Sequence, residues 1–312
     1  MIFRKGTAVQ LTGKSTAFSY ISDKYAFSKI IGESAYLYRT GVEFTPQELY
    51  MLTGIGTSLA ADHYLFKPKK FRLTKFKIDD TPENGWDLPV KLIYPIVTGP
   101  DIEPFGYKKT NDFCILPYDK KDTSKPIGTE KMIAENKELF EYLFRHKELI
   151  DQQSEKSKMM HRGKEFYALS KIGPYTFAEN IVAVRDNSKF CACVINKTAT
   201  PWNVMKQTVC VKHTIIISQD KTGRCISRDE ANYICGILNS DIVIDYIHSI
   251  FKTTGFSLNK SNLYLPLYDK ENPLHRKIGK MALNASREEG DIALIQKRLS
   301  ELYLKLCGKR DK

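Results

Sequence analysis

Residues 227–269 constrain the fold most, because they combine a capped amphipathic helix with a polar, basic loop. Ser227 and Glu230 form a capping box, in which each side chain accepts a hydrogen bond from a backbone N–H at the helix start. Apolar residues then recur at spacings of three and four as far as Ile250, which is typical of a helix with one buried face. The sequence Asn239-Ser240-Asp241 predicts a break that caps a second helix.

A net charge of +12 over 312 residues favours a polyanionic partner, because a basic surface attracts nucleic acid and releases its counterions. The alternative is a surface kept soluble by an ordinary excess of lysine. Basic and amide side chains in strands and loops can bond phosphates and base edges. The candidate DNA-binding residues are Lys69, Lys70, Arg72, Lys108, Lys109, Asn111, Arg185, Asn187, Lys189, Lys197, Lys252, Asn259 and Lys260.

The densest basic segment covers residues 67–77, where phenylalanines alternate with basic residues. A strand there would place Lys70, Arg72 and Thr74 on one face, where they would follow a phosphate backbone. An edge strand that lysines protect from aggregation is the alternative. The loop residues between 185 and 197 are instead expected to read base edges.

The pattern of elements predicts an α+β fold of two β-rich lobes with packed helices, joined by a long helix and ending in a helical tail. Residues 1–127 form the first lobe, with strands at 91–97 and 113–118, and charged residues at helical spacing predict a connecting helix over 128–160. Residues 161–269 form a mixed recognition lobe, and residues 270–312 form the helical tail. In the second lobe we expect strands at 175–177, 180–184, 190–195 and 209–217.

Seven cysteines without an export signal indicate reduced thiols. Cys191, Cys193, Cys210 and His213 have spacings that would allow four zinc ligands. Because both pairs lie in alternating apolar runs, we predict small buried side chains on strands and no bound metal.

Three features follow one another within residues 227–269: Leu238-Asn239-Ser240 on the helix, Phe256-Ser257 in the loop and Leu265-Pro266 after it. Three earlier segments complete the order: 94–102, 113–119 and 166–169. As an ordered set covering about two thirds of the chain, they resemble the C-terminal target-recognition region of type IIG restriction-modification enzymes and related adenine-specific DNA methyltransferases.

The resemblance implies sequence-specific binding of duplex DNA. Methyltransferases of this kind carry an (Asp/Asn/Ser)-Pro-Pro-aromatic catalytic motif and a glycine-rich S-adenosylmethionine site, and this sequence contains neither. We therefore expect neither methylation nor cleavage from this chain alone. S-adenosylmethionine and Mg²⁺ would belong to a catalytic domain or subunit, and this chain would be a fragment of a larger enzyme or a separate specificity chain.

Two other functions stay open. Asp101, Asp119 and Lys121 match the loose pattern of metal-dependent nucleases, in which two carboxylates hold Mg²⁺ and a lysine orients the attacking water. The helices at 129–157 and 272–307 would alternatively bind other subunits of a restriction-modification complex. No apolar run approaches the ~20 residues of a membrane span, so we expect a cytoplasmic protein.

Overall fold

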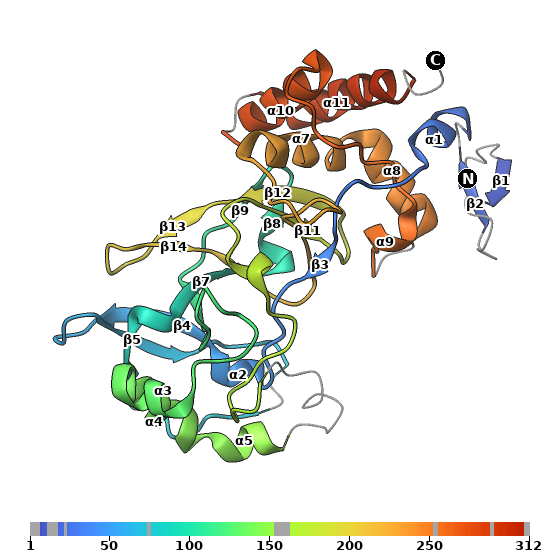
Figure 1. Cartoon of the computed structure of the whole chain (residues 1–312). Coiled ribbons are helices and arrows are strands. Elements are labelled where there is room, and N and C mark those ends of the chain that lie inside the picture. The colour runs from blue at the N-terminus through green and yellow to red at the C-terminus, as the bar shows by residue number, and fades with distance from the viewer. Residues whose placement is uncertain are drawn as a thin grey trace.

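The computed structural model describes residues 7–10, 18–21, 24–73, 76–152, 163–251, 255–287 and 290–308, with side chains from residue 27 onward. It contains 35% helix and 26% strand, which confirms the α+β class. Two sheets lie against each other at the centre, and helices cover their outer faces (Figure 1). Among the described residues, no helix has the length and apolar character that crossing a membrane requires.

The larger sheet has six strands in the order β15-β7-β10-β4-β5-β6. In chain order they are β4 (Met51–Thr57), β5 (His63–Pro68), β6 (Trp86–Pro89), β7 (Ile93–Val97), β10 (Asp112–Ile115) and β15 (Val209–Cys210). All neighbouring strands are antiparallel except β15 and β7. The short helices α2 (Gln47–Tyr50) and η1 (Val90–Leu92) lead into β4 and β7. The strands expected at 91–97 and 113–118 are therefore present, side by side and somewhat shorter.

The expected basic strand over 67–77 is wrong, because β5 ends at Pro68. The Lys69 backbone N–H still donates to the Met51 carbonyl, at 2.8 Å, but the chain then leaves the sheet. Leu73, which the expected strand would place on the face opposite Lys70 and Arg72, is 85% exposed and does not pack on the core. Residues 74 and 75 lie outside the described part of the chain. Over residues 67–73 and 76–77, no regular basic face forms.

The single helix expected after residue 128 is also wrong. The chain forms three short helices, α3 (Thr129–Glu135), α4 (Lys137–Arg145) and α5 (Lys147–Asp151). They pack on the larger sheet through Met132, Leu139 and Leu143. Residues 153–162 lie outside the described part, and the domain boundaries at 127, 160 and 269 stay predictions.

The break between α4 and α5 occurs at His146, whose side chain bonds both its own helix and the distant Asp80. Its ring Nδ1 lies 2.7 Å from the Tyr142 carbonyl oxygen, the acceptor that a continuous helix would offer to the backbone N–H of His146. Its Nε2 lies 2.9 Å from the Asp80 carboxylate, which holds the ring in place. The His146 ring thus occupies the carbonyl that would accept the next helical hydrogen bond, and α4 ends there.

The smaller sheet has the order β12-β11-β16-β3 and is antiparallel throughout. Its strands are β3 (Arg39–Thr40), β11 (Ile181–Arg185), β12 (Cys191–Ile195) and β16 (Thr214–Ile217). The strands expected at 180–184 and 190–195 are confirmed. Residues 175–177 instead belong to the 3-10 helix η3 (Pro174–Phe177).

The strand expected at 209–217 divides in two, because the chain passes there from one sheet to the other. β15 pairs with β7 in the larger sheet, whereas β16 pairs with β11 in the smaller one. Gly41 lies against this crossing, and a Cβ atom there would stand 2.2 Å from the Val211 carbonyl oxygen. The close approach requires glycine, and direct backbone contact joins the two sheets.

Side chains alternate along β11 and β12 between two apolar layers, as the period of a strand requires. Val182 and Val184 face the helices, together with Ala192 and Val194. The opposite faces pack against β7 and β15; they carry Ile181, Ala183, Cys191, Cys193 and Ile195. The cysteines of the zinc hypothesis therefore lie in an apolar layer between the sheets.

Helix α7 (Arg228–Leu238) covers the smaller sheet, and α8 (Asp241–Ile250) follows it after Asn239 and Ser240. Both elements, the capping box and the break are confirmed. The tail forms α10 (Pro273–Ala285) and α11 (Ile292–Cys307), which lie above α7 in Figure 1 and bury Ile278 and Leu299 against it. The remaining elements are β1 (Thr7–Gln10), β2 (Phe18–Ile21), α1 (Lys24–Ile30), η2 (Gly99–Asp101), β8 (Ile102–Glu103), β9 (Gly106–Tyr107), β13 (Lys197–Ala199), β14 (Met205–Gln207) and α9 (Leu258–Ser261).

Candidate nucleic-acid interface

A hollow of about 480 Å³ runs along β12, between the β8–β9 hairpin and the ends of three helices. The first turn of α7, the end of α10 and the start of α11 form its helical wall. We call it the basic groove. The polar side chains that line it are those of Glu103, Lys109, Lys189, Asn196, Lys197, Arg228, Asn232 and Ser286.

Positive charge dominates the basic groove. Lys109, Lys189, Lys197 and Arg228 form no ion pair with any residue that the structure describes, whereas the one acidic lining residue, Glu103, lies 3.2 Å from the Lys108 ammonium. Four cations that lack ion-pair partners in the described ranges repel one another around one hollow, and an anion in the hollow would relieve the repulsion. The groove is therefore suited to phosphate.

Two asparagines add groups that can donate and accept hydrogen bonds. The Asn196 side-chain oxygen is buried and has no hydrogen-bond partner within the described ranges. Asn232, on α7, is only 4% exposed and lines the same hollow. A buried amide oxygen without a partner is uncommon in a folded protein.

Backbone hydrogen bonds fix the walls of the groove. The Phe105 N–H, in the β8–β9 hairpin, donates to the Ala192 carbonyl of β12 at 2.9 Å. The Asn239 side chain, at the end of α7, bonds both backbone groups of Ala192, accepting from its N–H at 2.9 Å and donating to its carbonyl at 2.7 Å. The Asn239 side chain thus makes backbone hydrogen bonds of the kind that a neighbouring strand would make, and it links α7 to the smaller sheet.

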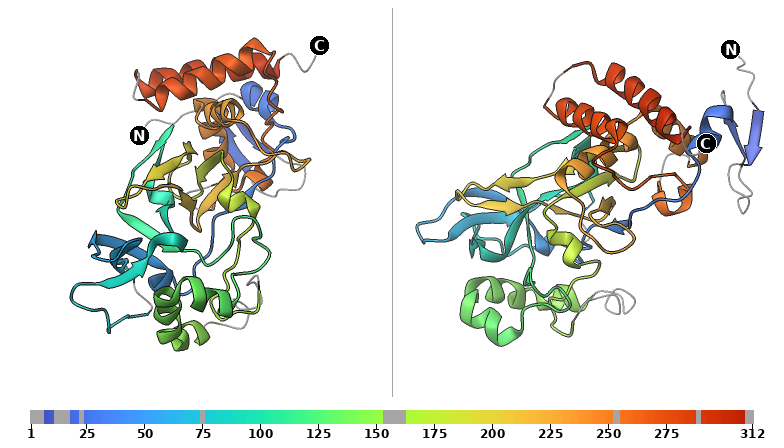
Figure 2. Two further views of the ribbon diagram at one scale, coloured as in Figure 1. Left: turned by 60° about the vertical axis from the view of Figure 1, so that its left-hand side comes forward. Right: turned by 45° about the horizontal axis from the view of Figure 1, so that its top comes forward.

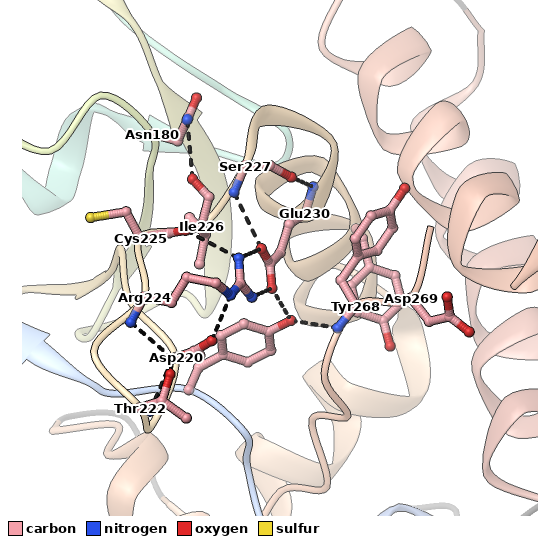
Figure 3. Close-up of polar contacts among 12 residues, drawn as sticks. Asn180, Asp220, Thr222, Arg224, Cys225, Ile226, Ser227, Glu230, Tyr268 and Asp269 are labelled. Atoms are coloured by element: carbon pink, nitrogen blue, oxygen red, sulfur yellow. Dashed lines mark hydrogen bonds and ion pairs between the residues drawn. The ribbon is translucent and has the colours of Figure 1, made fainter. Parts of the chain in front are cut away.

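A buried polar network holds the first turn of α7 (Figure 3). Glu230, which is 1% exposed, accepts two hydrogen bonds of 2.9 Å from the Arg224 guanidinium and one of 2.9 Å from the Tyr36 hydroxyl. The Tyr36 oxygen in turn accepts from the Tyr268 N–H, at 2.9 Å. Because these bonds connect three segments distant in sequence, they fix the position of Arg228 two residues away.

Asp220 completes the network, with its carboxylate 2.9 Å from Arg224 Nε. Burial alone would raise the pKa of Asp220, but hydrogen bonds from Thr222 and the charge of Arg224 hold it below its usual value. Hydrogen bonding to Glu230 raises the pKa of Arg224 further. Arg224 is thus charged and paired with Glu230 and Asp220, so we do not count it among the cations offered to a ligand.

Several predicted DNA-binding residues have internal partners instead. Lys69 forms an ion pair with Asp112, and Asn111 donates to the Gly54 carbonyl at 2.6 Å. Lys70 and Arg72 are exposed on the irregular segment after β5. The structure therefore does not gather these residues into one surface with the basic groove.

Arg185 stabilises its own turn. Its guanidinium donates to the Asn187 carbonyl at 2.9 Å and to the Ser188 hydroxyl at 2.6 Å. The Asn187 side chain is exposed at this turn. An arginine bonded in this way would have to break both contacts to reach a guanine, which argues against the base reading expected of it.

The loop after α8 lies apart from the groove. Asn259 lines a separate hollow of about 170 Å³ beside Lys221, and Lys260 is exposed on α9. Lys252 lies outside the described residues. Of the thirteen candidates, the structure brings Lys109, Lys189 and Lys197 together.

The residues of the nuclease hypothesis lie at opposite ends of two paired strands. β7 and β10 are antiparallel, with Cys114 opposite Tyr94. Asp101 follows the end of β7, where it accepts from the Thr98 N–H at 2.8 Å. Asp119 and Lys121 follow the end of β10, where Asp119 and Lys120 lie near Tyr94. At about 3.3 Å per residue, Thr98 and Tyr94 alone are ~13 Å apart. One metal ion does not reach both carboxylates.

The thiols of the zinc hypothesis are buried in the layer between the sheets. Burial raises the pKa of Cys191 to about 11 and that of Cys210 to about 12, which opposes the thiolate form that zinc binds. His213 is largely exposed and turned out at a positive φ of 70°. No group of three His, Cys, Asp or Glu side chains in the described part of the chain is placed to hold a metal.

No family model and no curated protein matches the chain. Sequence reasoning missed Arg228 and Asn232 as site residues. Both stand on the helix whose capping box was predicted, one turn apart on one face. The helix prediction places Arg228 and Asn232 next to each other, but only the fold brings both into the hollow that Lys197 also lines.

Proposed function

We propose that this chain is a duplex-DNA recognition domain of a restriction-modification methyltransferase system. The observation that carries the proposal is the basic groove, where four cations without described partners face one hollow. Phosphate contacts of this kind position a protein on DNA and supply much of its affinity. The overall charge of +12 adds long-range attraction.

In such a system the chemistry is carried by a partner. A catalytic domain or subunit would bind S-adenosylmethionine and Mg²⁺, and this chain would select the sequence on which it acts. The resemblance of residues 94–119 and 227–269 to target-recognition regions supports that division of roles. The separation of Asp101 from Asp119 favours it over a nuclease site within this chain.

The test replaces Lys109, Lys189, Lys197 and Arg228 together with alanine and measures binding to a duplex by fluorescence anisotropy at several salt concentrations. Each lost phosphate contact lowers the slope of log affinity against log salt by ~0.9, so the four together should lower it by as much as ~3.6. In a matched control, four exposed lysines near the larger sheet are replaced with alanine: Lys121, Lys125, Lys131 and Lys137.

The control variant has the same net charge as the groove variant and should keep most of the wild-type slope. Circular dichroism would verify that both variants fold. Equal losses in the two variants would show that general charge, and not the groove, binds DNA. Absence of duplex binding by the wild-type chain would overturn the proposed function itself.

A further inference from the structure

The β13–β14 hairpin follows β12 and extends alongside the larger sheet, on the same side as β4 and β5 (Figures 1 and 2). Its strands pair Lys197 with Gln207 and Ala199 with Met205. Lys197, its first residue, also lines the basic groove. The hairpin and the groove therefore form one continuous surface.

Hydrogen bonds give the hairpin tip a defined shape. Thr200 donates its hydroxyl to the Val204 carbonyl at 2.8 Å and accepts from the Val204 N–H at 3.2 Å. The Asn203 N–H donates to the Thr200 carbonyl at 3.0 Å, and Asn203 has a φ of 61°, a conformation that asparagine tolerates better than most residues. The tip is thus ordered before any ligand arrives.

A half-buried tryptophan and a buried lysine anchor the hairpin on the larger sheet. The Trp202 ring packs against Phe113 and Tyr64, with centroids 5.0 and 5.4 Å apart. The Lys206 ammonium donates to the backbone carbonyls of Val90, Lys91 and Ile93, the last two at 2.9 and 2.8 Å. These contacts restrain the hairpin from moving relative to the sheet.

The side chains between the two anchors point away from the body. Val204 is 47% and Met205 59% exposed, and the exposed Asn203 side chain makes no hydrogen bond with the described residues. Apolar side chains that stay exposed on a rigid tip do not contribute the free energy that burying them would give. Beside a cationic groove, they indicate a surface shaped for a partner.

We infer that this hairpin is the element that reads bases, which rests on the proposed binding of duplex DNA. The major groove admits a two-stranded ribbon, is about 8.5 Å deep, and displays adenine edges and thymine methyl groups. Because Trp202 holds one side of the tip on the larger sheet, the exposed side, with Asn203, Val204 and Met205, is the part that faces the major groove, about 10 Å along the strand from Lys197. Asn203 then bonds an adenine edge, and Val204 and Met205 pack on thymine methyls.

In this assignment the hairpin tip contacts the bases and the turn of Arg185 and Asn187 does not, because Arg185 is bonded within its own turn. It also gives separate roles to two neighbouring surfaces. The basic groove determines affinity for any duplex, and the hairpin tip determines preference among sequences.

The test selects duplexes from a pool with a randomised 20-base-pair core and sequences the bound fraction. The tip variant combines Asn203→Gly, which retains the positive φ, with Val204→Ser and Met205→Ser. We expect the wild type to enrich a motif with A·T positions, and the tip variant to lose about 5- to 150-fold of the preference at one or two of them. Its affinity for the unselected pool should change less than about twofold.

Asn187→Ala at the other turn is the matched control and should enrich the wild-type motif. Thermal unfolding would verify that each variant is folded. Binding of the pool without enrichment, or the same motif from the tip variant, would overturn the inference and leave the proposed function standing. Failure of the wild type to bind the pool at all would overturn both.

Discussion

Lys206 and Lys197, on paired strands of one hairpin, show two different uses of a lysine. Lys206 is buried, bonded to three carbonyls and 4.8 Å from the centre of the Tyr94 ring. Lys197 is exposed and has no ion-pair partner among the residues described. The first charge is part of the folded structure, whereas the second is available to a ligand. Composition alone counts them as equal.

The buried lysine leads to a prediction about pH. Burial lowers the pKa of Lys206 to about 8, below its ordinary value of 10.5. Between these two values the unfolded chain binds more protons than the native one, so stability rises with pH. From pH 7 to pH 10 this contribution amounts to about 2 kcal/mol. Urea denaturation should show this increase in the free energy of unfolding for the wild type. For Lys206→Met, the increase should be smaller by that contribution.

Lys91→Met serves as the control for that comparison, because the Lys91 side chain is exposed. Titration of tyrosines and cysteines is common to all three proteins and cancels in the differences. If Lys206→Met followed the wild-type pH dependence throughout, the buried ammonium would contribute nothing and the assigned pKa would be wrong.

At the scale of elements, sequence reasoning succeeded where the signal is local. The Ser227 and Glu230 capping box and the alternation along β11 and β12 were predicted correctly, because neighbouring residues determine them. It failed at residues 67–77 and 128–157. The end of β5 and the His146 break depend on partners as distant as Asp112 and Asp80. Local periodicity contains no information about such contacts.

The packing of α7 on α10 gives a prediction of its own. A Cβ atom on Gly236 would stand 2.7 Å from Ile278 Cγ2 and 3.1 Å from the Ile278 carbonyl oxygen. Gly236→Ala should therefore destabilise the protein by about 1 to 3 kcal/mol, although alanine favours a helix by about 1 kcal/mol. Urea denaturation measures the net effect.

Gly106→Ala is the control, because its added Cβ would meet nothing within 4 Å. It should change the free energy of unfolding by less than about 0.5 kcal/mol. A Gly236→Ala variant as stable as the wild type would mean that the two helices separate readily and that their close contact is not needed.

For the whole molecule, the basic groove is assembled from segments that lie far apart along the chain. Lys109 and Lys189 lie in connections between strands, Lys197 begins β13, and Arg228 begins α7. Charge and residue type were enough to nominate three of them from the sequence. Their convergence on one hollow, and the internal bonding that removes Arg185 and Lys69 from the surface, depend on the fold.

The most direct test of the central claim measures amide hydrogen exchange with and without duplex DNA. Binding at the proposed surface should slow exchange in residues 102–109, 189–207 and 228–232, because DNA would cover the groove and the hairpin. Exchange in α3 to α5, residues 129–151, should stay unchanged. Binding that protects residues 129–151 and leaves the groove and the hairpin unprotected would contradict the account.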